Sequence, residues 1–113
     1  MTEFTNESLS TNFTVPDEIT VLAQMRYAST LFELRGEEIF WRQFKAACVV
    51  IEDWESAVIP EHTMLYKEKL KDDEPEDALY LSEATDPRIL SIIMWAGAQV
   101  GNHVAELKVI SKN

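Results

Sequence analysis

The chain has 113 residues, enough for one domain with one hydrophobic core and too few for a two-domain enzyme. Its composition, 46% apolar with three glycines and four prolines, excludes collagen-like, linker-like and wholly disordered chains. The formal net charge of −10 repels phosphate backbones and anionic lipid, so it argues against binding to nucleic acid or to a membrane and favours protein partners.

The beginning of the chain indicates its compartment. Its first residues are polar and acidic, whereas a signal peptide needs a basic region followed by an apolar one. The most apolar stretch, residues 89–100, is about a dozen residues long, and a membrane-spanning helix needs about 20. The only cysteine is Cys48, which fits a reducing environment. We therefore expect a cytoplasmic protein.

Residues 1–16 are predicted to form an extended, partly mobile N-terminal arm, because Thr, Ser and Asn dominate this segment. Phe13-Thr14-Val15 alternates as a strand does, but Pro16 follows at once. A docked extended segment is therefore expected here rather than a sheet. Residues 17–113 are expected to form a single helical domain.

The first half of that domain predicts two helices. One runs from about Thr20 to Leu34 and is closed by Gly36. The other runs from Glu37 to Val58 and is stopped by Pro60. The apolar stripe of the first helix consists of Val21, Leu22, Met25, Ala28, Leu31 and Phe32.

Two further helices are predicted after Pro60. A shorter one begins at Pro60 and reaches about Leu70, followed by an acidic loop over residues 71–77. The last helix runs from Pro87 to about Ile110, because Thr85-Asp86-Pro87 is a typical helix start. The expected fold is therefore all-α, a small bundle of about four helices with the extended N-terminal arm.

The residues that could carry chemistry do not form a known catalytic or metal-binding pattern. His62 and His103 do not complete the Glu-x-x-His pairs of di-iron bundles, and Cys48 lies among apolar neighbours. We therefore expect no enzyme, no metal and no cofactor. An alternative is a magnesium-dependent helical hydrolase, whose ligands would be the spaced carboxylates Glu33, Glu37, Glu52 and Glu55.

Two features are candidate partner-binding sites. Gly97 and Gly101 lie four apart in the last helix, where each glycine costs up to ~1 kcal/mol relative to Ala, so a close neighbour is expected. That neighbour is either a helix of the same chain or a second chain, which would make the last helix the face of a homo-oligomer or of a complex with a partner. The other feature is the acidic loop, whose carboxylates are Asp72, Asp73, Glu74, Glu76 and Asp77; it is either a solvated loop or a surface for a basic groove.

The linear pattern also resembles a known family. Phe13-Thr14-Val15-Pro16, Gln24-Met25-Arg26-Tyr27, Thr85-Asp86-Pro87-Arg88 and Trp95-Ala96-Gly97, with a tryptophan-bearing central helix, are similar to the tail-assembly chaperones of siphophages. The resemblance implies a small, acidic, mostly helical protein that coats the tape-measure protein until the tail tube polymerises around it. The resemblance does not assign a function to any individual residue of this chain.

Two functions follow as expectations. The first is a non-enzymatic protein-interaction protein, most specifically a phage tail-assembly chaperone that binds the tape-measure protein in the host cytoplasm by helix-in-groove contacts. The second is an acidic inhibitor of a host nucleic-acid-binding or defence protein.

Overall fold

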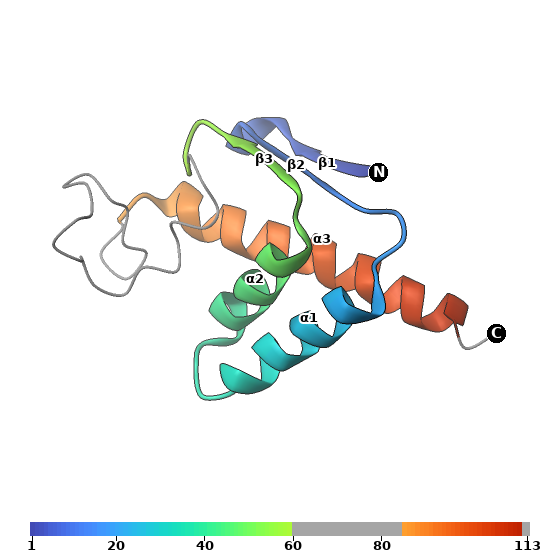
Figure 1. Ribbon diagram of the computed structural model, residues 1–113. Coiled ribbons are helices and arrows are strands. Elements are labelled where there is room, and N and C mark those ends of the chain that lie inside the picture. The colour runs from blue at the N-terminus through green and yellow to red at the C-terminus, as the bar shows by residue number, and fades with distance from the viewer. Residues whose placement is uncertain (60–84, 112–113) are drawn as a thin grey trace, which may run out of the picture.

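The computed structural model describes residues 1–59 and 85–111. These residues form a three-stranded antiparallel sheet that covers α2 and α3, while α1 lies on the far side of α2 (Figure 1). The strands are β1 (Thr2–Asn6), β2 (Thr11–Val15) and β3 (Asp53–Ser56), and the helices are α1 (Val21–Glu33), α2 (Ile39–Val50) and α3 (Pro87–Ser111). The prediction of an all-α bundle of four helices is therefore wrong, because the chain is mixed α/β.

The N-terminal segment forms two strands of the sheet instead of an arm. β2 is the central strand, and Phe13 lies opposite Phe4 of β1 on one side and Trp54 of β3 on the other. Side chains alternate between two faces in both strands of the hairpin: the inner face is buried in β2 and half-buried in β1, and the outer face is polar. Pro16 does not prevent pairing, because it comes directly after the last residue of β2 and removes no ladder hydrogen bond.

The second predicted helix is shorter than expected. α2 ends at Val50, and Ile51 is extended, with φ −67° and ψ 128°. The backbone N–H of Glu52 donates to the carbonyl of Thr14 at 3.0 Å, which starts the pairing of β3 with β2. β3 turns Trp54 inward, where its ring lies 5.8 Å from that of Phe13 and 6.1 Å from that of Phe44. Aromatic packing and strand pairing therefore end the helix eight residues early.

The last helix has the expected bounds. α3 runs from Pro87 to Ser111, and a carboxylate oxygen of Asp86 accepts the backbone N–H of Arg88 at 2.9 Å as a cap. No helix of the described residues is long and apolar enough to cross a membrane. The short helix predicted from Pro60 to about Leu70 lies outside the described residues.

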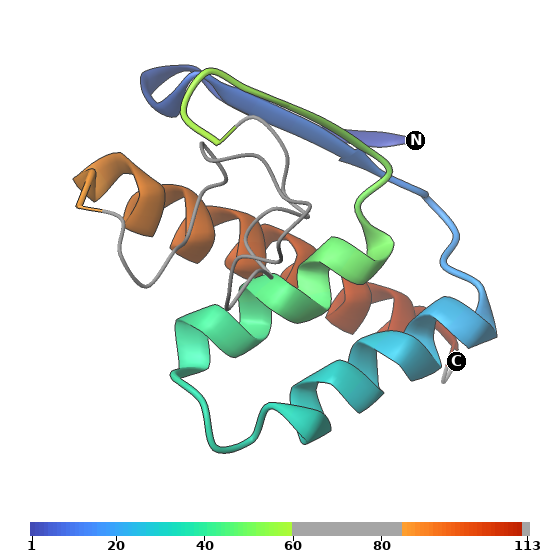
Figure 2. The same cartoon turned by 60° about the vertical axis from the view of Figure 1, so that its left-hand side comes forward.

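One core joins the sheet to α2 and α3. Phe13 is completely buried, and its ring meets the ring of Trp95 on α3 edge-on at 5.2 Å. Figure 2 shows the same order of layers from another side, with the sheet above α2 and α3 and with α1 farthest from the sheet. The largest fully buried side chains come from all these parts: Phe13, Val15, Phe44, Ile59, Ile92 and Val100.

Candidate functional site

α1 is held as a helix by its ends and by packing on one side. The Thr20 hydroxyl accepts the backbone N–H of Ala23 at 3.2 Å, and the amide of Gln24 donates to the carbonyl of Ile19 at 2.9 Å. Tyr27 is buried, and Ala23 and Leu31 pack against the core. These contacts fix which side of α1 points outward.

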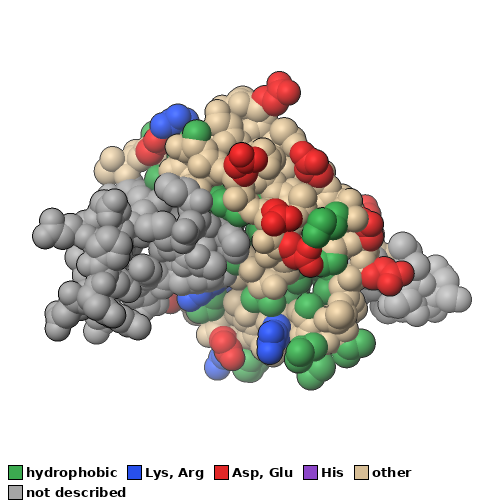
Figure 3. All heavy atoms as spheres, turned by 45° about the horizontal axis from the view of Figure 1, so that its top comes forward, with side chains coloured by type: hydrophobic (Ala, Val, Ile, Leu, Met, Phe, Trp, Pro, Cys, Tyr) green, Lys and Arg blue, Asp and Glu red, His purple; other side chains and the backbone are tan. Residues whose placement is uncertain are grey.

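The outward side of α1 is apolar. Val21 is 72% exposed, Met25 60% and Phe32 66%, and with exposed Ala28 they follow a spacing of four, three and four residues. We call Val21, Met25, Ala28 and Phe32 the α1 stripe; Leu22, 56% exposed, lies beside it. Hydrophobic side chains gather along the lower edge of the molecule, where α1 lies (Figure 3). The helical spacing groups these residues with Leu31, but Leu31 packs against the core and the others stay exposed to water.

An apolar surface of this kind is a candidate contact site. Monomeric proteins rarely expose a continuous apolar patch of several large side chains. Removing one such side chain from water is worth roughly 1.5–3 kcal/mol when it is buried completely. The Arg35 guanidinium lies 4.3 Å from the centre of the Phe32 ring and donates to the Phe32 carbonyl at 3.0 Å, so a cation borders one end of the stripe.

The opposite side of the molecule is acidic. Glu3, Asp53 and Glu55 stand on the outer face of the sheet, which we call the acidic sheet face. The Thr14 hydroxyl donates to a carboxylate oxygen of Asp53 at 3.1 Å. Residues 1–15 and 51–59, which contain the three strands, have five carboxylates and no Lys or Arg. The sheet side of the described chain is therefore acidic.

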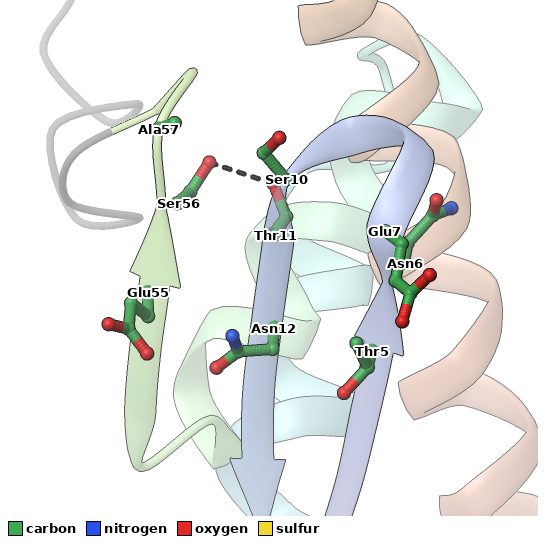
Figure 4. Close-up of a pocket in the computed structure, with 9 residues that line it drawn as sticks. All are labelled: Thr5, Asn6, Glu7, Ser10, Thr11, Asn12, Glu55, Ser56 and Ala57. Atoms are coloured by element: carbon green, nitrogen blue, oxygen red, sulfur yellow. Dashed lines mark hydrogen bonds between the residues drawn. The ribbon is translucent and has the colours of Figure 1, made fainter.

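A polar groove crosses the sheet face at its hairpin end (Figure 4). Its volume is about 570 Å³, and Thr5, Asn12 and Glu55 form a row across its three strands. The hydroxyl oxygens of Thr11 and Ser56 lie 2.8 Å apart and bridge β2 and β3. The full lining is Thr5, Asn6, Glu7, Ser10, Thr11, Asn12, Glu55, Ser56 and Ala57. These groups offer hydrogen bonds and two carboxylates, and none of the lining hydroxyls has a histidine in the lining to act as a base.

The predicted hydrolase carboxylates lie on separate elements. Glu33 ends α1, Glu37 lies in the α1–α2 connection, Glu52 precedes β3, and Glu55 is on β3. Within residues 1–59 and 85–106, no three His, Cys, Asp or Glu side chains gather where they could hold a metal ion. A helical hydrolase would need these carboxylates together on facing helices, and the described residues do not bring them together in that way.

The predicted partner-binding residues fall into two groups. A Cβ at Gly97 would meet the Phe44 backbone nitrogen at 3.3 Å, so the close neighbour of this glycine is α2 of the same chain. A Cβ at Gly101 would meet only the Tyr27 hydroxyl, at 3.5 Å. Their binding to a partner stays a prediction. The acidic residues Asp72, Asp73, Glu74, Glu76 and Asp77 lie outside the described residues.

The α1 stripe is a candidate site that the sequence predictions do not include. A signal for it exists, because α1 carries a second apolar series, Ala23, Tyr27 and Leu31, at a spacing of four. When a helix has two apolar series on different sides, packing one series against a neighbouring helix leaves the other series exposed. Comparison of the chain with protein-family models, with curated proteins and with solved structures finds no match.

Proposed function

We propose that the protein is a non-enzymatic protein-interaction protein that binds an amphipathic helix of its partner along the α1 stripe. The single observation that carries this proposal is the exposure of Val21, Met25 and Phe32, each above half, on a helix whose other side packs against the core. The stripe spans three turns of helix, about 16 Å, which is the length that a short amphipathic helix presents.

The more specific proposal is a phage tail-assembly chaperone that binds the tape-measure protein. It is supported by the resemblance of the sequence to that family and by the two-sided surface of the molecule. A tape-measure protein is long, and its amphipathic helices aggregate when they are bare. A chaperone that covers such a helix with the α1 stripe turns its acidic sheet face outward, and like charges on neighbouring copies then keep the complex soluble.

The test is affinity capture with the tagged full chain, during infection or from cells that express the neighbouring genes, with the captured protein identified by mass. We expect the full chain to capture a very long, helix-rich phage protein, and we expect Met25→Asp to abolish this capture. Ser91→Asp is the matched control, because it adds the same charge at an exposed position of α3. If Met25→Asp and Ser91→Asp capture the long protein equally well, the stripe is not the binding site.

The second candidate function, an acidic inhibitor of a host nucleic-acid-binding or defence protein, is favoured by the acidic sheet face. Its partner would carry a basic groove, and binding would weaken as salt screens the charges. In the same experiment this function predicts capture of a basic host protein. That capture is lost with the combined change Glu3→Gln, Asp53→Asn and Glu55→Gln and is retained with Met25→Asp.

A further inference from the structure

The α1 stripe is complementary to itself when two copies run antiparallel. Its four residues are spaced as the seam of a coiled coil, with steps of four, three and four. An antiparallel two-fold axis at the centre of the stripe sets Met25 against Ala28 of the second copy, and Val21 against Phe32. Each contact then occurs twice, as an isologous interface requires.

The sizes of these side chains favour the antiparallel arrangement. A long side chain meets a methyl group at both central positions, so the two helices approach closely without a gap. A parallel pair would instead set Met25 against Met25 and Ala28 against Ala28, which crowds one level and leaves the next one empty. The sequence of the stripe therefore distinguishes the two directions.

Arg35 is the charged group on which this arrangement depends. Glu18 precedes the helix and Arg35 follows it, both exposed, and exposed Glu33, Glu37 and Glu38 lie near Arg35 in the chain. Running antiparallel brings Glu18 of each copy to the end of the other helix, where the exposed cation Arg35 offsets these carboxylates. The acidic sheet face lies on the other side of the molecule in both Figure 1 and Figure 2, so the two sheets stay far apart despite the net charge of −10.

We propose that, without its partner, the protein is a two-fold homodimer in which α1 packs antiparallel against α1 of a second copy. The partner helix and the second copy use the same α1 stripe, so partner binding replaces the second copy. The proposal rests on the proposed function only in this competition; the dimer itself is a property of the isolated chain.

The test is sedimentation equilibrium of the isolated full chain over a wide range of concentrations. The chain mass is 13.0 kDa, and we expect a reversible equilibrium between this mass and twice this mass. Met25→Asp should be monomeric, and Ser91→Asp should dimerise like the parent chain. Far-UV circular dichroism checks that both variants are folded. A parent chain that stays monomeric at every concentration overturns the proposal, and the capture experiment above then judges the proposed function separately.

Two further measurements test the arrangement itself. Arg35→Glu should weaken dimerisation about tenfold, because the cation that faces Glu18 at each end of the seam becomes a carboxylate, and adding Glu18→Arg should restore it. In a Cys48→Ala background, a mixture of Met25→Cys and Ala28→Cys chains should form a disulfide between unlike chains. Dimers cross-linked between two Met25→Cys chains instead would overturn the antiparallel direction.

Discussion

The two glycines of α3 differ in what surrounds them, and this difference predicts opposite effects of the same substitution. Gly97→Ala places a methyl group 3.3 Å from the Phe44 backbone nitrogen and 3.4 Å from two atoms of Gln43. Gly101→Ala places it in ordinary contact, 3.5 Å from the Tyr27 hydroxyl. Both changes replace Gly with Ala, which has the higher helix propensity. A difference in stability between the two variants therefore reports how closely α3 packs on α2 at Gly97.

The magnitudes follow from two opposing effects. Replacing Gly by Ala inside a helix is worth up to about 1 kcal/mol, and Gly101→Ala should raise the free energy of unfolding by most of this amount. At Gly97 the same gain is opposed by overpacking, typically 1–3 kcal/mol, because Phe44 is completely buried and the α2 backbone has little room to retreat. Gly97→Ala should therefore leave the protein less stable than Gly101→Ala by about 1–3 kcal/mol.

Urea denaturation followed by tryptophan fluorescence and by circular dichroism measures this difference. About 1 kcal/mol corresponds to roughly 4–8 °C in Tm for a domain of this size, so thermal unfolding gives an independent check. If Gly97→Ala is as stable as Gly101→Ala, or more stable, α2 does not press on α3 at Gly97 and the close approach is refuted.

Three other changes test the core and the titrating groups. Phe13→Ala should lower the free energy of unfolding by about 3–5 kcal/mol in urea denaturation, because it empties a fully buried ring site. Burial raises the pKa of Tyr27 above its ordinary 10.0, so the unfolded chain loses this proton first. Stability should fall as the pH rises past about 10, and less steeply in Tyr27→Phe. Hydrogen bonds from Arg88 hold the pKa of Asp86 below its ordinary 3.8. These hydrogen bonds stabilise the folded protein above that pH, and the stabilisation is lost as the pH falls through the lowered pKa of Asp86. Arg88→Gln should raise the Asp86 pKa in an NMR titration. An unchanged pKa would contradict this.

α3 could be predicted from the sequence because its signals are local. Asp86 and Pro87 mark its start, and its apolar residues recur at helical spacing for six turns. Neither signal depends on any distant part of the chain. The helical part of α1 was equally predictable, since Thr20 caps it in the structure as its sequence position suggests.

The sheet could not be predicted with the same reasoning because its stability is not local. Thr2–Asn6 and Thr11–Val15 both alternate, and that period of two was the available signal. Each segment has too few apolar residues to be recognised alone. The ring of Phe13 packs against those of Phe4, Trp54 and Trp95, the last of them 82 positions away. The helical spacing that continued past Val50 was overridden by the same distant contacts.

The α1 stripe shows a different limit. Helical periodicity predicts that α1 is a helix and which residues share a side, but it does not predict which side meets the core. That choice depends on where α2 and α3 lie. α1 packs against α2, and buried Tyr27 has its hydroxyl beside Gly101 of α3, while Met25 stays exposed. A candidate binding surface was therefore interpreted as part of the core.

The order of strands in the sheet sets the order in which the protein can fold. β2 and β3 are neighbours, although residues 16–52, including all of α1 and α2, separate them. Closing a flexible loop of this length costs about 3 kcal/mol in chain entropy. Pairing of α1 with α2 shortens that loop, so β3 should join the sheet after the β1–β2 hairpin and after the two helices have met. Pulsed hydrogen exchange during refolding should protect the β2 amides that face β1 before those that face β3, and simultaneous protection would contradict this order.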